Sequence, residues 1–186
     1  MRAITKTDIK LRQATLSDIP QIVALLNRCY RSDEGWTNEA DLIGGIRTTE
    51  EEIQNVIQDD LQYLFVFPHP QDDSQILGTV AVDFTPIDGK PSAYIGTFSV
   101  SPELQGQGIG DALLSAVETF ANRHAKAKGL THLSMSILSE RPELLAYYQR
   151  RGYALTGETM PFPTDGNNGE PKREDLVLNF LQKSIT

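Results

Sequence analysis

The stretch Gln105-Gly106-Gln107-Gly108-Ile109-Gly110 decides the fold, because of what lies on either side of it. Before it, residues 94–100 have the composition of a strand, which Ser101-Pro102 ends. After it, apolar residues recur at helical spacing over residues 111–121. A helix begins with unpartnered backbone N–H groups, its dipole favours an anion there, and glycines let the backbone approach phosphates closely. The stretch therefore predicts a site for a pyrophosphate-containing cofactor.

Two common phosphate-binding motifs do not fit this stretch. A Walker-type loop requires Gly-x-x-x-x-Gly-Lys-Ser/Thr, and neither Lys-Ser nor Lys-Thr follows these glycines. A dinucleotide fold requires Gly-x-Gly-x-x-Gly, but Asp111 occupies the third glycine position. That fold also places an acidic residue about 20 residues further on, and residues 129–133 contain none.

A third pattern fits better. Gln105-x-x-Gly108-x-Gly110, preceded by Val100-x-Pro102 and followed by Leu113-Leu114, resembles the acetyl-CoA signature of the GNAT acyltransferase superfamily. A second block, residues 141–153, resembles the later helix-to-strand segment of that family, in which a tyrosine lies four residues before a glycine and an aromatic residue. The resemblance extends over residues 9–181, and we expect residues 1–186 to form a single domain.

Hydrophobic periodicity predicts the order β-α-α-β-β-β-α-β-α-β-β. This is an α/β (α+β) fold with a mixed, mostly antiparallel central sheet flanked by helices, and it matches the GNAT arrangement. The expected strands cover residues 9–14, 63–67, 76–84, 94–100, 132–138, a segment from 153 onward, and 176–181. The expected helices follow residues 15–18, 48–49 and 110, and cover residues 141–151. Residues 31–47 and 160–171 are expected to be irregular loops.

Composition limits the partners and the location. The net charge of −8 argues against nucleic acid, which needs clustered Lys and Arg, and mildly favours a cationic small molecule. The single cysteine, Cys29, fits a reducing compartment and is expected to be a buried small apolar residue. The chain begins without an apolar run of signal-peptide length and contains no apolar stretch long enough for a membrane span. We therefore expect a cytoplasmic protein that does not act at membranes, as a monomer or homodimer, and assign no residue to a metal.

The resemblance implies which residues hold acetyl-CoA. Backbone groups of Phe98, Ser99 and Val100 would bind the pantetheine arm between the splayed strands 94–100 and 132–138. Backbone amides from Gln105 to Asp111 would bind the pyrophosphate; these residues are Gln105, Gly106, Gln107, Gly108, Ile109, Gly110 and Asp111. Tyr148 would contact the thiol end of the cofactor.

Acyl transfer to an amine needs loss of a proton from the amine, stabilisation of the oxyanion and protonation of the leaving thiolate. Tyr148 stands in the tyrosine position of the family and is the candidate acid; its alternative role is packing. The oxyanion donor would be a backbone N–H near Phe98 or Ser99. Members of the family often carry a glutamate near the position of Gly96, where this chain has no side chain. The proton must then pass to water or to another carboxylate; the candidates are Asp83, Glu39 and Glu34.

The acceptor wall is expected from residues 31–47 and 160–171. Trp36, the only tryptophan, could stack on a ligand or cover the core, and Glu34 and Glu39 could bind an amine. Arg47 and Arg141 could contact a carboxylate or the cofactor phosphates, or form surface salt bridges. The leading hypothesis is an N-acetyltransferase that moves an acetyl group from acetyl-CoA to a primary amine of a small, cationic or amino-acid-like molecule by direct attack in a ternary complex. The alternatives are a non-catalytic acyl-CoA sensor or interaction module, and a protein or peptide N-acetyltransferase.

Overall fold

The computed structural model of the chain describes residues 2–36, 38–86, 90–164, 166 and 168–186. Its main sheet has the strand order β1-β3-β4-β5-β6-β9-β7, and a second sheet pairs β2 with β8. The strands are β1 (Arg12–Gln13), β2 (Ile43–Gly44), β3 (Gln62–His69), β4 (Asp72–Asp83), β5 (Ser92–Val100), β6 (His132–Leu138), β7 (Ala154–Pro161), β8 (Glu170–Pro171) and β9 (Val177–Ser184). The helices are α1 (Ile19–Arg31), α2 (Glu50–Gln58), α3 (Ile109–Ala127) and α4 (Pro142–Gln149), with short 3-10 turns at Lys6–Asp8, Leu16–Asp18 and Pro102–Leu104.

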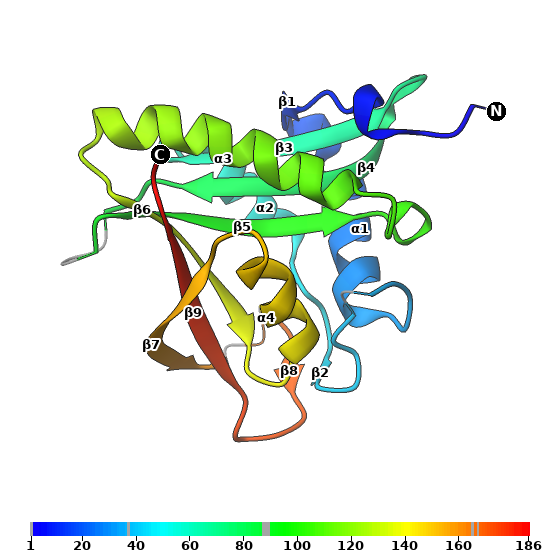
Figure 1. The fold of residues 1–186 in the computed structure, drawn as a ribbon. Helices are drawn as coiled ribbons and strands as arrows, with labels where there is room; N and C mark the ends of the chain where they lie inside the picture. Colours follow the sequence, from blue (N-terminus) through cyan, green and yellow to red (C-terminus); the bar gives the residue numbers. More distant parts are fainter. Residues whose placement is uncertain (1, 37, 87–89, 165, 167) are drawn as a thin grey trace.

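Helices cover both faces of the sheet, as Figure 1 shows with α3 in front of the strands and α1 and α2 behind them. Alternation along β4 explains this, because successive side chains of a strand point to opposite faces. Val80, Val82 and Phe84 belong to the core cluster that includes α3, whereas Ala81 packs in the cluster that includes α1 and α2. A strand that is apolar on both faces is therefore buried in the middle of the sheet.

The position of the site follows from one pair of strands. β5 and β6 run parallel, and their pairing covers only residues 92–94 of β5 and 132–134 of β6. The other strand pairs are antiparallel among the described residues. Beyond Tyr94 the two parallel strands separate, so a gap opens in the middle of the sheet with α3 starting at its edge (Figure 1). The predicted fold class, with a mixed and mostly antiparallel sheet, is confirmed.

Several predicted element boundaries are wrong. The first strand is limited to Arg12–Gln13, because a 3-10 turn at Lys6–Asp8, closed by reciprocal Thr5 and Asp8 contacts, takes the preceding residues out of the sheet. The helix after the glycines begins at Ile109 and not at Asp111. The two loops at residues 31–47 and 160–171 are not wholly irregular, because β2 and β8 pair there, at Ile43↔Pro171 and Gly44↔Glu170.

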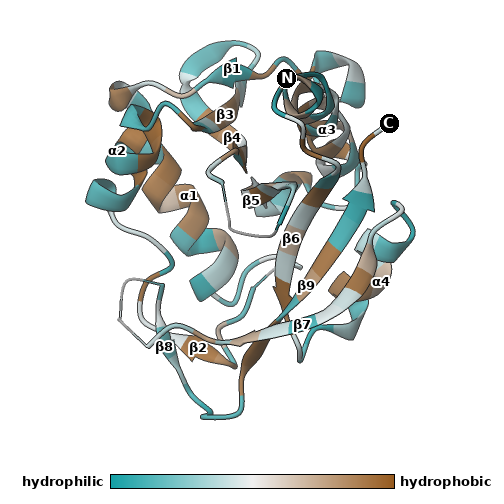
Figure 2. Cartoon of the chain, turned by 90° about the vertical axis from the view of Figure 1, so that its left-hand side faces the viewer, coloured by the Kyte–Doolittle hydropathy of each residue, from teal (hydrophilic) through white to brown (hydrophobic). Residues whose placement is uncertain are grey.

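No helix in the described part of the chain is both long enough and apolar enough to cross a membrane. The hydropathy view in Figure 2 shows the apolar sides of α1 and α3 turned towards the strands. Cys29 lies in that interior with no exposed surface, and burial raises the pKa of its thiol to about 12. The expectation of a buried cysteine is confirmed.

Candidate active site

Two cavities meet where β5 and β6 separate. The glycine-loop cavity, of about 600 Å³, is lined by the end of β5, the glycine turn, the start of α3 and α4. The inter-strand cavity, of about 240 Å³, lies between β5 and β6 and is also lined by the end of α1 and by Phe162, Pro163 and Asn168. Four residues line both cavities: Tyr30, Phe98, Leu144 and Tyr148. A ligand that fills the first cavity would therefore reach the second beside these side chains.

Most of the predicted cofactor residues line the glycine-loop cavity; these are Phe98, Ser99, Val100, Gln105, Gly106, Gly108, Gly110, Asp111 and Tyr148. Gln107 and Ile109 do not line it. Ile109 is buried in the core with Leu113, and the Gln107 side chain donates to the Glu103 carbonyl. Gly106 and Gly108 have φ of 79° and 76°, in the left-handed region that favours glycine.

The side chain of Gln105 holds the loop around Trp36. Its Oε1 accepts from the Trp36 N–H at 2.6 Å, and its Nε2 donates to the Val100 carbonyl at 3.0 Å. Arg141, which is buried, donates to the carbonyls of Trp36 and Asn38 at 2.9 and 3.0 Å. Trp36 is 45% exposed, lines the glycine-loop cavity and lies 5.6 Å from the Tyr147 ring. Trp36 therefore stands at the mouth of this cavity and does not cover the core.

The carboxylate of Asp111 at the start of α3 is neutralised. It accepts hydrogen bonds from the Tyr147 hydroxyl and the Arg151 Nε, both at 2.8 Å, and the Arg151 guanidinium lies over the Tyr147 ring. Burial by itself would raise the pKa of Asp111, but the bonds from Tyr147 and Arg151 outweigh it and lower that pKa. The ion pair keeps a negative charge at this helix start from repelling an anionic ligand.

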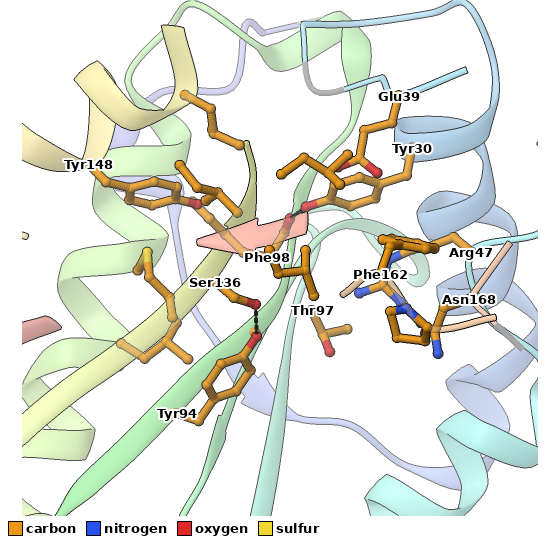
Figure 3. Close-up of a pocket in the computed structure, with 18 of the residues that line it drawn as sticks. Tyr30, Glu39, Arg47, Tyr94, Thr97, Phe98, Ser136, Tyr148, Phe162 and Asn168 are labelled. Atoms are coloured by element: carbon orange, nitrogen blue, oxygen red, sulfur yellow. Dashed lines mark hydrogen bonds between the residues drawn. The ribbon is translucent and has the colours of Figure 1, made fainter. Parts of the chain in front are cut away.

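Tyr148 is a buried tyrosine between the two cavities. Its ring is 8% exposed and packs edge-on against Tyr147 and Tyr153, and its hydroxyl makes no hydrogen bond to any residue that the structure describes. Burial raises its pKa well above the ordinary value, so it stays protonated at neutral pH. Figure 3 shows Tyr148 and Tyr30 entering from opposite sides, with Phe98 between them and the Tyr30 hydroxyl donating to the Phe98 carbonyl.

The space beside Gly96 is filled by Tyr94. A Cβ built on Gly96 would lie 3.1 Å from Tyr94 Cε1, because residues two apart on a strand share a face. The Tyr94 hydroxyl is hydrogen bonded to that of Ser136 at 2.6 Å, across the gap between β5 and β6 (Figure 3). Next to this pair, Thr97 has φ of 50°, and neither Thr97 nor Phe98 has a partner in the β4 register. This bulge turns the backbone of β5 at the point where the cavities meet.

The structure separates the three acidic candidates. Glu39 lines the inter-strand cavity, where its carboxylate accepts from Arg31 Nη1 at 2.9 Å. Asp83 lines neither cavity and accepts from the Thr85 N–H at the far end of β4. Glu34 lines neither cavity and is ion-paired with Arg28 on the surface. Only Glu39 of the three is brought together with Tyr148.

Two residues of this region were not predicted. Tyr30 lines both cavities, and Lys6 lies against Gly108, since a Cβ there would be 2.7 Å from the Lys6 Nζ. Both come from distant segments, and no local pattern marks them. Arg47, named in the sequence as a possible contact for a carboxylate or for the cofactor phosphates, lines the inter-strand cavity.

The two loops at residues 31–47 and 160–171 close the inter-strand cavity together. Beyond the β2–β8 pair, Arg31 Nη2 donates to the Asn168 carbonyl at 2.5 Å, and Lys172 Nζ donates to the Ala40 carbonyl at 2.6 Å. Phe162, Pro163 and Asn168 complete the lining from the second loop. The two loops therefore form one wall of the inter-strand cavity.

A family model described as the acetyltransferase (GNAT) family matches residues 19–153. The chain belongs to this family. It is thus an N-acetyltransferase, and the resemblance drawn from the two sequence blocks is confirmed. In a search of curated proteins, no sequence matches.

Solved structures share the GNAT fold at low identity. The ribosomal-protein-alanine N-acetyltransferase of Brucella melitensis is 21% identical, with a TM-score of 0.65 over 94% of this chain and 99% of that one. The spermidine N-acetyltransferase of Vibrio cholerae, in complex with CoA and spermine, is 16% identical, with a TM-score of 0.67 over 96% of each chain. The ribosomal-protein-S18-alanine N-acetyltransferase of Escherichia coli is 14% identical, with a TM-score of 0.65 over 96% of this chain and 94% of that one.

Proposed function

We propose that this GNAT enzyme transfers the acetyl group of acetyl-CoA to the primary amine of a small molecule, by direct attack in a ternary complex, and that Tyr148 protonates the leaving thiolate. The observation that carries the proposal is the position of Tyr148, which lines both cavities with a hydroxyl that makes no hydrogen bond to the described residues. The acetyl donor would enter from one cavity and the amine from the other.

The glycine-loop cavity fits acetyl-CoA. Gly106 and Gly108 lack side chains and are in the left-handed conformation, and the space beside Gly106 is open where the turn approaches the start of α3. The N–H groups of that first helical turn would hold the pyrophosphate, with Lys6 beside Gly108 adding positive charge. The backbone of Phe98, Ser99 and Val100 would hold the pantetheine arm along the free edge of β5.

Bound acetyl-CoA supplies the activated acetyl group as a thioester. The amine nitrogen attacks its carbonyl carbon, so that a C–N bond forms and the C–S bond breaks. A backbone N–H near Phe98 or Ser99, beside the bulge of β5, would donate to the negative charge that develops on the carbonyl oxygen. Tyr148 would give its proton to the departing sulfur, and the amine would pass a proton to water, with Glu39 as the candidate carboxylate that lines the inter-strand cavity.

The small volume of the inter-strand cavity favours a small acceptor over a protein. Its volume of about 240 Å³ lies below the range of about 300 to 1,000 Å³ that is typical of ligand pockets. The paired β2 and β8 strands join the two loops that contribute to the lining of this cavity. We therefore place a protein N-acetyltransferase second. The single buried cysteine supports the cytoplasm as the location.

Titration calorimetry with acetyl-CoA and free CoA, beside a thiol-release assay over pooled amines, tests the proposal. We expect both cofactors to bind and one amine pool to release CoA. Binding without release from any pool would indicate a sensor and contradict the proposed reaction. Failure to bind either cofactor would overturn the assignment of the glycine-loop cavity.

A further inference from the structure

We infer that the acceptor carries a carboxylate near its amine and that Arg47 binds this carboxylate in the inter-strand cavity. The inference rests on the proposed function and names the substrate class of the same site. It also changes the expectation from net charge, because the protein is acidic overall while this cavity is not. An amino acid or a related amino-carboxylate would fit, and a polyamine would not.

The charges of the cavity carry the argument. Among the described residues that line it, the ionised side chains are Arg31, Arg47 and Glu39. Arg31 and Glu39 form an ion pair at 2.9 Å, with side chains only 5% and 12% exposed. The pair is neutral as a unit, so Arg47 gives the cavity a net positive charge. A cationic acceptor would find the one carboxylate already engaged.

Arg47 is placed to bind a ligand. It forms no ion pair with any residue that the structure describes, and its guanidinium lies 5.4 Å from the centroid of the Tyr30 ring. Its Nη1 donates to Asn168 Oδ1 at 3.3 Å, which leaves the Nη2 and Nε donors without a partner among the described residues. The planar donor set of a guanidinium matches a carboxylate, and stacking on a ring holds that plane in place.

The Tyr30 side chain links Arg47 to the point where the two cavities meet. Tyr30 carries Arg47 over its ring, and its hydroxyl donates to the Phe98 carbonyl, where the two cavities meet. Figure 3 shows Arg47, Phe162 and Asn168 grouped on the α1 side of the cavity, opposite Tyr148. A small molecule that places its carboxylate at Arg47 would therefore bring its amine towards Phe98 and Tyr148.

The test compares matched acceptors. Thiol release would be measured with free amino acids, with their carboxamides, and with diamines and polyamines. We expect at least one amino acid to exceed its carboxamide in kcat/KM by 10-fold or more, and the polyamines to react more slowly. A carboxamide or polyamine that reacts as well as any amino acid would overturn the inference while supporting the proposed function. An absence of transfer to every acceptor would overturn both this inference and the proposed function. Binding of CoA would then indicate a non-catalytic sensor, and no binding would show that the glycine-loop cavity does not hold CoA.

Variants of Arg47 provide an independent readout. R47Q should raise the KM for the preferred amino acid by 10-fold or more, leave the rate with its carboxamide unchanged, and leave CoA affinity unchanged. R47K, which keeps the charge but not the planar donors, should recover part of the loss. R123Q is the matched control, because it removes the same charge from an exposed position on α3 that lines neither cavity. An R47Q enzyme with the same KM as R123Q would overturn the inference.

Discussion

The two cavities of this enzyme are built in different ways. The glycine-loop cavity takes most of its lining from one continuous stretch, residues 98–111, and presents backbone made accessible by glycines. The inter-strand cavity is lined by side chains from α1, the loop before α2, β5, β6, α4 and the loop before β8. The first depends on local conformation, whereas the second depends on how distant segments pack. A phosphate site at a helix start tolerates little change in backbone conformation. The side chains that line the inter-strand cavity, in contrast, can be substituted one at a time.

Tyr148, where the cavities meet, should show the largest effect. Y148F removes the proton donor, and we expect kcat to fall by about 100-fold or more, since general acid catalysis contributes about 10² to 10⁴. CoA affinity should be unchanged by calorimetry. Because burial raises the pKa of Tyr148, its acid function should persist through neutral pH and be lost only as pH rises through that raised pKa.

Y153F is the matched control for Y148F. Tyr153 lines neither cavity, and its buried hydroxyl has no partner among the described residues. Its removal should leave kcat within about twofold and should not lower stability, because an unsatisfied buried hydroxyl is costly. Equal kcat for Y148F and wild type would remove Tyr148 from the mechanism.

A substitution of Asp18 tests the packing of the helix that contributes Tyr30 and Arg31 to the inter-strand cavity. It is buried before α1, the helix that carries Tyr30 and Arg31, and accepts from Arg12 Nη1 and Nη2 at 2.7 and 2.9 Å. D18N leaves Arg12 partly unpaired, and we expect the free energy of unfolding to fall by about 2 kcal/mol in urea titrations.

The pH dependence sharpens the Asp18 test. The hydrogen bonds and charge of Arg12 lower the pKa of Asp18 in the folded protein below its unfolded value of about 3.9. The stabilisation is therefore complete above that unfolded value and is lost as pH falls through the folded pKa. The difference between wild type and D18N should shrink below about pH 4. A difference that stays constant down to the acid transition would contradict the assigned role.

Gly108 tests the backbone of the glycine-loop cavity. Its φ of 76° is in the left-handed region, and a Cβ would lie 2.1 Å from Lys6 Cε. G108A should strain the loop and raise the Kd for acetyl-CoA about tenfold, or about 1.4 kcal/mol. The matched control is G129A, at the end of α3, with φ of 71° and open space around the added methyl group. It should cost similar stability without changing the Kd, and equal Kd values for both variants would refute the role of the loop.

Gly96 should give the smallest effect. The methyl group of G96A would lie 3.1 Å from the Tyr94 ring, and we expect a loss of about 1 kcal/mol in unfolding free energy. In a Tyr94→Leu background the same substitution should cost less, which a double-mutant cycle would measure. Gly96→Glu should not raise kcat, because Tyr94 already fills the space. A faster Gly96→Glu enzyme would show that this space is available to a base.

The sequence by itself determined the family, the order of the main elements and the glycine turn, because each rests on local pattern. Hydrophobic periodicity indicates strands and helices. The turn needs glycine at positions 106 and 108 because their φ angles, 79° and 76°, lie in the left-handed region. It also predicted Tyr148 by its spacing to Gly152, and the structure places this side chain where the two cavities meet. Only the tertiary structure separated Glu39 from Asp83 and Glu34, paired β2 with β8, and brought Arg47 beside Tyr30. These outcomes depend on side chains far apart in sequence that meet only when the sheet and its loops are packed.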